Sequence, residues 1–258
     1  MQRITAEVAG RPMVAWRIPG PRPPVVCVHG AGVSSREFLP FLKALGSRRE
    51  TWTVDLPGFG ASDGPPEPLG LRALADALID WLTAVDLEQA VFLGGSFGCQ
   101  VVVDAALRHP DRAAALVLVG PTVDADARSF VRQVLRWMRN APHERPSMAA
   151  LNLADYRDAG SRRVAGAFRE ALRDRIEDKL PHVVKPTLVV RGAQDRMVPQ
   201  EWAEQVVRLL PAGRLAVVED SGHMVAYRQA PVLAGLVADF LAHQEAAGRP
   251  GPQRGPRG

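Results

Sequence analysis

The sequence feature that most constrains the fold is the stretch 91–103, in which a short apolar run meets a Gly-x-Ser-x-Gly turn and continues as an apolar segment of helical length. This order predicts a strand, a sharp turn and a helix, with the hydroxyl of Ser96 at the apex. Because the turn leaves Ser96 little room, we expect its backbone to adopt a positive φ. Gly94 and Gly98 are expected to be glycines because a Cβ at either position would collide with the neighbouring strand or helix. The pattern alone also fits an ordinary tight turn, so its interpretation depends on the rest of the chain.

Apolar runs and helical patterns alternate through most of the 258 residues. Strands are expected at 25–28, 52–56, 91–94, 115–119, 187–191 and 214–218, with a weaker one at 14–18. Helices are expected at 36–45, 69–85, 97–109, 201–210 and 231–243. Apolar strands separated by helices predict an α/β fold with a mainly parallel sheet and helices on both faces. Ligands bind such sheets at the carboxyl ends of the strands.

The alternation stops between about residues 122 and 181. Two amphipathic helical patterns occur in this region, 127–140 and 161–180, and a stretch containing Pro142 and Pro146 joins them. We therefore expect a helical insertion at 122–181, lying as a cap over the sheet edge that presents the serine.

The length suits one large α/β domain. Its core is expected to comprise residues 1–121 and 182–245, interrupted by the cap insertion at 122–181. Residues 246–258, dominated by Gly, Pro, Arg and Gln, are expected to form a disordered tail.

Composition and charge argue for an ordinary soluble domain and against a nucleic-acid partner. The chain is 47% hydrophobic and 23% charged, which is typical of a soluble protein with a sizeable core. Its formal charge is +4, and Arg249, Arg254 and Arg257 near the end carry most of the excess. No basic stripe with interleaved aromatic residues occurs, so a nucleic-acid partner is not expected.

The cysteines and the N-terminus indicate the compartment. Cys27 and Cys99 each lie inside an apolar segment, which favours buried reduced thiols over a disulfide. Residues 1–5 lack the apolar region of a signal peptide, and no run reaches membrane-spanning length. We expect a cytoplasmic monomer or homodimer that acts on a small molecule, without membrane association.

A serine hydroxyl is a weak nucleophile at neutral pH, so Ser96 needs a base and a carboxylate that orients the base. Of the six histidines, His223 is the favoured base because it follows the last expected strand on a glycine loop. Asp195 is the favoured carboxylate, because it follows a buried strand by a short turn and completes the chain order Ser, Asp, His. Asp124 and Asp126 remain alternatives, and Asp195 could instead cap the following helix.

Five motifs support this interpretation together. They are HGAG at 29–32, DLPGFGAS at 55–62, GGSFG at 94–98, GAQD at 192–195 and SGH at 221–223. In this order and spacing they resemble the α/β-hydrolase superfamily, over about residues 14–243. The resemblance implies about eight strands, a helical cap and a triad of Ser96, His223 and Asp195. It also implies an oxyanion hole made by the backbone N–H groups of Ala31 and Phe97, with no cofactor and no metal.

The serine narrows the expected chemistry within this superfamily. Related epoxide hydrolases and haloalkane dehalogenases carry an aspartate at the position of Ser96. A serine favours cleavage of a carboxylic ester, a thioester, a lactone or a carbon–carbon bond. We expect a small-molecule ester hydrolase that forms an acyl-enzyme. A carbon–carbon hydrolase of ring-cleavage products would use the same triad, although HGAG only partly matches that group's His-Gly-Gly-Gly loop, and a ligand-binding protein on this scaffold is a third alternative.

The expected cap would select the substrate. Its apolar candidates for lining a pocket are Trp137, Met138, Leu151, Leu153, Tyr156 and Phe168. Residues of this kind at helical spacing also serve a cap's own packing. We name Trp137 and Tyr156 as substrate-binding candidates, together with His29, which precedes a glycine turn and is chiefly expected to shape that loop.

Overall fold

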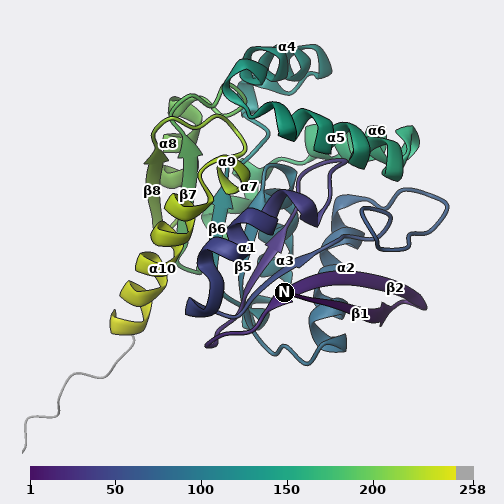
Figure 1. Ribbon diagram of the computed structural model, residues 1–258. Helices are drawn as coiled ribbons and strands as arrows, with labels where there is room; N and C mark the ends of the chain where they lie inside the picture. Colours follow the sequence, from purple (N-terminus) through teal and green to yellow (C-terminus); the bar gives the residue numbers. More distant parts are fainter. Residues whose placement is uncertain (248–258) are drawn as a thin grey trace, which may run out of the picture.

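The computed structural model describes residues 1–247, and a single eight-stranded sheet forms its centre (Figure 1). The strands are β1 (Gln2–Val8), β2 (Arg11–Ile18), β3 (Val25–Val28), β4 (Thr51–Val54), β5 (Ala90–Gly95), β6 (Ala113–Val119), β7 (Thr187–Gly192) and β8 (Gly213–Val218). Their order is β1-β2-β4-β3-β5-β6-β7-β8. Strands β3 to β8 run parallel, whereas β2 pairs antiparallel with both β1 and β4. The predicted mainly parallel sheet of eight strands is therefore confirmed.

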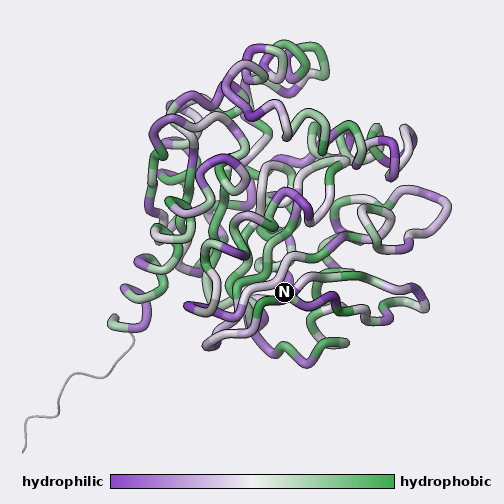
Figure 2. The backbone as a smooth tube through the Cα atoms, in the orientation of Figure 1, coloured by the Kyte–Doolittle hydropathy of each residue, from purple (hydrophilic) through white to green (hydrophobic). Residues whose placement is uncertain are grey.

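Helices cover both faces of this sheet. They are α1 (Leu39–Leu45), preceded by the short 3-10 helix η1 (Ser35–Phe38), α2 (Leu71–Ala84), α3 (Phe97–Arg108), α8 (Gln200–Leu209), α9 (Val225–Arg228) and α10 (Ala230–Ala247). One apolar layer contains α2, α3 and α8, and the other contains α1, α9 and α10. Adjacent residues of β5 enter different layers, because Phe92 faces α2 and α3 while Val91 and Leu93 face the opposite side. Burial on both faces explains why hydrophobic residues follow the central strands in Figure 2.

The chain between β6 and β7 forms four α-helices, of which the first three lie at the end of the sheet toward which the parallel strands point, whereas the fourth packs against α3 (Figure 1). They are α4 (Phe130–Asn140), α5 (Pro146–Ala159), α6 (Ser161–Arg173) and α7 (Ile176–Lys179). Helix α5 was not predicted. Pro146 occupies its first turn, where the missing N–H group leaves no intrahelical bond unmade. The helix predicted at 161–180 is divided at Asp174, whose backbone is extended.

Both ends of the described chain differ from the prediction. Strand β1 was missed, and it forms a hairpin with β2 through Ala9 and Gly10, which both have positive φ. At the other end α10 continues to Ala247, so disorder from residue 246 was wrong for two residues. Residues 248–258 of the predicted tail lie outside the described part. Within residues 1–247, no helix combines the length and the apolar character that crossing a bilayer requires.

Candidate active site

Ser96 lies in the tight turn between β5 and α3. Its φ of 52° and ψ of −119° confirm the predicted positive φ. A Cβ on Gly98 would lie 2.1 Å from the carbonyl oxygen of Val28, and one on Gly94 would lie 2.5 Å from the backbone nitrogen of Cys99. Both glycines are therefore required by the close approach of α3 to the sheet. The turn places the hydroxyl at the helix N-terminus, where negative charge is favoured.

The structure brings His223 and Asp195 together. His223 follows β8 and Asp195 follows β7, and the Nδ1 atom of the imidazole lies 2.8 Å from Oδ2 of the carboxylate. The other oxygen, Oδ1, accepts the N–H groups of Met197 at 2.7 Å and Val198 at 3.0 Å. The cap role considered for Asp195 is not observed, since α8 (Gln200–Leu209) has Pro199 at its N-cap; Oδ1 instead holds the turn before that helix while Oδ2 contacts the histidine.

The two alternative carboxylates make other contacts or face solvent. Oδ2 of Asp124 pairs with Nη2 of Arg136 at 2.6 Å, and Asp126 is exposed. Within residues 1–247, neither carboxylate bonds to His223. The geometry therefore favours Asp195 as the partner.

The surroundings of His223 favour its protonated form. Burial lowers the pKa of this imidazole, but the charge and hydrogen bond of Asp195, helped by Glu144, raise the pKa above its ordinary value of 6.5. A raised pKa makes the imidazole a stronger base toward a neighbouring hydroxyl.

Ser96 and His223 line one narrow cavity of about 10 Å³, together with Glu37. The Oγ atom of Ser96 lies 3.4 Å from Oγ1 of Thr122, and no hydrogen bond joins Ser96 to His223 in the described part of the chain. Catalytic hydrogen bonds commonly tighten only when substrate binds.

The loop that contains Ala31 is held from two sides. Oε1 of the buried Glu37 accepts the N–H of Gly30 at 3.1 Å, and Oδ2 of Asp155 in α5 accepts both the N–H and the O–H of Ser34 at 2.9 Å. Ala31 lines a cavity together with Ser96 and Phe97. Phe97 opens α3, so its N–H has no intrahelical acceptor. The two residues expected to form an oxyanion hole thus lie at the wall of the cavity that Ser96 faces.

His29 does not line this cavity. Its side chain is buried, Nε2 accepts the N–H of Leu56 at 3.1 Å, and Nδ1 donates to the carbonyl of Gly30 at 2.9 Å. Burial lowers the pKa of His29, in keeping with a neutral ring that accepts at one nitrogen and donates at the other. The expected substrate contact is therefore not supported, and His29 has the loop-shaping position.

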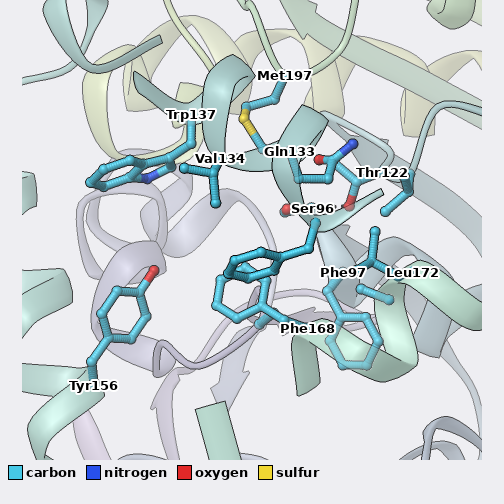
Figure 3. A pocket seen from close by; sticks show the side chains of 14 residues that line it. Ser96, Phe97, Thr122, Gln133, Val134, Trp137, Tyr156, Phe168, Leu172 and Met197 are labelled. Atoms are coloured by element: carbon cyan, nitrogen blue, oxygen red, sulfur yellow. Dashed lines mark hydrogen bonds between the residues drawn. The ribbon is translucent and has the colours of Figure 1, made fainter. Parts of the chain in front are cut away.

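The cavity beside Ser96 has a volume of about 240 Å³ and an apolar lining (Figure 3). Trp137 and Tyr156, both expected to bind substrate, line it, as does Phe168. Met138 is exposed on α4 and is not part of this lining. Helices α4, α5 and α6, which we call the cap, therefore supply apolar side chains to the cavity beside the serine.

A hydrogen-bonded link through Asn140 and Glu144 escaped prediction from the sequence. Asn140 Oδ1 accepts the N–H of Arg196 at 3.2 Å, and its Nδ2 donates to Oε1 of Glu144 at 2.8 Å. The same Glu144 oxygen accepts the N–H of Met224 at 3.0 Å. Arg196 and Met224 directly follow Asp195 and His223, so this link joins the two loops that carry them. No spacing in the sequence signals such a contact.

Comparison with known proteins agrees with this geometry. Residues 25–235 match the model of the alpha/beta hydrolase family. The 2-hydroxymuconate semialdehyde hydrolase of Pseudomonas sp. (strain CF600) is 27% identical, over 87% of this chain and 88% of the relative. A 2-hydroxy-6-oxo-2,4-heptadienoate hydrolase of Pseudomonas putida (strain F1) is also 27% identical, over 95% of this chain and 100% of the relative.

Two solved structures share the fold. A thermophilic esterase from Thermogutta terrifontis superposes with a TM-score of 0.80 at 22% identity, covering 94% of this chain and 99% of the esterase. A meta-cleavage product hydrolase from Pseudomonas fluorescens IP01 gives 0.75 at 20% identity, covering 93% and 98%. At these identities the similarity establishes the architecture alone.

Proposed function

Because the chain belongs to the alpha/beta hydrolase family, we propose that it is a serine hydrolase that cleaves a small-molecule carboxylic ester, thioester or lactone through an acyl-enzyme on Ser96. The supporting observation is the 2.8 Å contact between His223 and Asp195, beside the cavity wall formed by Ser96. A buried acid, an imidazole and a hydroxyl on a strained turn are the parts that acyl transfer requires.

The proposed reaction has two steps. His223 takes the proton from Ser96 as Oγ attacks the carbonyl carbon, and the N–H groups of Ala31 and Phe97 stabilise the oxyanion. His223 then protonates the leaving group, which departs as an alcohol or thiol. In the second step His223 deprotonates a water molecule that attacks the acyl carbon, and the acid leaves as Ser96 regains its proton. Asp195 holds the imidazole in the required tautomer throughout.

The direct test is hydrolysis of p-nitrophenyl acetate by the protein and its Ser96→Ala variant. We expect a burst of one p-nitrophenolate per enzyme followed by slower release, with an acetyl adduct on the peptide that contains Ser96. The variant should show neither the burst nor the turnover while its circular dichroism is unchanged. Ser129→Ala, which alters the hydroxyl that caps α4 away from the triad, serves as the matched control. Full activity in Ser96→Ala would refute the proposal.

Carbon–carbon bond hydrolysis is a second candidate, supported by the names of the two Pseudomonas relatives. This reaction would use the same Ser96, His223 and Asp195. A 2-hydroxy-6-oxo-dienoate absorbs strongly, so its loss of absorbance measures cleavage directly. A higher kcat/KM for the dienoate than for every ester tested would favour this second candidate.

A further inference from the structure

The cavity beside Ser96 shares part of its lining with a larger, open cavity on the helices between β6 and β7. The second cavity has a volume of about 810 Å³ and is lined mainly by α5 and α6. Four side chains line both cavities: Phe130, Tyr156, Phe168 and Leu172. In Figure 3 Phe168 lies on the side of the cavity toward Ser96 and Tyr156 lies across it, so the shared side chains include one close to the serine. These four side chains separate the two cavities, so a substrate group that outgrows the first would have to pass between them to reach the second.

The second cavity contains positive charge without a matching negative charge. Arg157, Arg169 and Arg173 line it, and its other lining residues within the described chain include no aspartate or glutamate. The nearest carboxylate contact of Arg157 is 4.0 Å, and that of Arg173 is 3.7 Å. These loose contacts at exposed side chains leave most guanidinium donors free to bind a ligand.

Other arginines of α6 are engaged elsewhere. Nη2 of Arg162 lies 2.5 Å from Oε2 of Glu67, and Nη2 of Arg163 donates to the carbonyl of Pro65 at 2.8 Å. Neither arginine lines the second cavity. Arg162 and Arg163 of α6 therefore contact the loop before α2, whereas Arg169 and Arg173 of the same helix line the second cavity.

We propose that the second cavity binds the far end of the substrate's acyl group and that this end carries a carboxylate. The inference rests on the proposed function and names its substrate class: esters of apolar dicarboxylic acids. The apolar lining would take the methylene chain out of water. The planar guanidinium groups at the cavity would pair with the terminal carboxylate.

The test compares p-nitrophenyl hydrogen suberate with p-nitrophenyl octanoate, which have equal acyl length and the same leaving group. The first ends in a carboxylate and the second in a methyl group. We expect kcat/KM to be about tenfold higher for the suberate, chiefly through a lower KM, because charge-assisted hydrogen bonds act on binding. High salt should reduce this ratio by screening the exposed guanidinium groups.

The double variant Arg169→Gln and Arg173→Gln should bring the ratio of the two kcat/KM values close to one. Arg162→Gln is the matched control, because this side chain lies on the same helix but does not line the cavity, and it should keep the wild-type ratio. Thermal unfolding of each variant checks that the cap is folded. Equal kcat/KM for the two esters in the wild type, or an unchanged ratio in the double variant, would overturn the inference while the proposed function stands. Absence of turnover and burst with both esters would overturn both.

Discussion

Gly120, at the end of β6, determines where the imidazole of His223 can lie. Its φ is +58°, and a Cβ there would lie 2.9 Å from Cε1 and 3.0 Å from Nδ1 of His223. The Oδ2 atom of Asp195 would lie 3.6 Å from the same Cβ. An alanine would therefore displace the ring first, and the pairing with Asp195 would change with it.

We predict that Gly120→Ala lowers kcat by up to about 10²-fold with a smaller effect on KM, because a misplaced base costs transition-state stabilisation. Steady-state kinetics with a p-nitrophenyl ester measures the change. Gly235→Ala is the control, since a Cβ at that position in α10 meets nothing within 4 Å. A fully active Gly120→Ala protein would contradict the importance of this contact.

The raised pKa of His223 predicts the pH dependence of activity. The base must be neutral to accept a proton, so kcat/KM should increase with pH through an acid limb above the ordinary pKa of 6.5. Asp195→Asn should lower the pKa of His223, move this limb to lower pH, and reduce kcat by about 10⁴-fold through loss of the correct tautomer. Rates measured from pH 5 to 9 test both effects. An unmoved limb in Asp195→Asn would show that another group titrates.

The role of a residue could be predicted from the sequence when the residue belongs to a motif. It could not be predicted when the role depends on how distant elements pack together. Ser96, Asp195 and His223 follow strands at spacings that the sequence displays, and the structure brings the last two into contact. Gly120 and Thr122 acquire their places only when β5, β6 and the loop after β8 assemble. Their sequence neighbourhood gives no signal of that assembly.

At the scale of elements, the cap does more than cover the sheet. Glu144 and Asn140, on either side of the turn after α4, bond to the residues that follow His223 and Asp195. A second cap glutamate makes a similar bond elsewhere: Oε2 of Glu170 in α6 accepts the N–H of Leu71 at 3.1 Å, at the start of α2. The two contacts differ mainly in whether they touch the triad loops.

The two glutamates, Glu144 and Glu170, allow a matched experiment. Glu144→Leu should reduce kcat by roughly tenfold or more and shift the acid limb of the pH profile to lower pH, because Glu144 helps to raise the pKa of His223. Glu144→Gln keeps an oxygen for the N–H of Met224 and should restore most of the kcat. Glu170→Leu should lower only the melting temperature. If both leucine variants lost stability alone, the link through Glu144 would be structural and nothing more.

The missed elements also have a physical explanation. The central strands were found because burial on both faces makes them continuously apolar. Strand β1 is an edge strand with mostly exposed residues, so it carries no such run. In α5 only Met148, Asp155 and Ala159 are buried, and one of these is acidic, so no apolar helical period is visible.

At the scale of the whole molecule, Glu37 couples stability to pH. Its carboxyl is buried, and burial raises its pKa from 4.5 to about 8, although the N–H of Gly30 and the charge of His223 oppose the rise. Between these two values the folded protein retains a proton that the unfolded chain releases. Folding stability contributed by this group must therefore fall as pH increases through the interval.

We predict that Glu37→Gln removes this dependence. The free energy of unfolding of the wild type, measured with urea from pH 5 to 8, should fall relative to the variant by on the order of 1 kcal/mol per pH unit. Glu7→Gln, which alters an exposed carboxylate of β1, should follow the wild type. Parallel curves for wild type and Glu37→Gln would show that Glu37 is ionised in the folded protein.

The crowding around Gly98 bears on how such a molecule could diversify. Because a Cβ on residue 98 would lie only 2.1 Å from the carbonyl oxygen of Val28, a larger residue could replace this glycine only if α3 moved away from the sheet. The side chain of residue 96, by contrast, projects from the turn and takes no part in this close contact. Evolution can therefore exchange the attacking group while inheriting the bend intact.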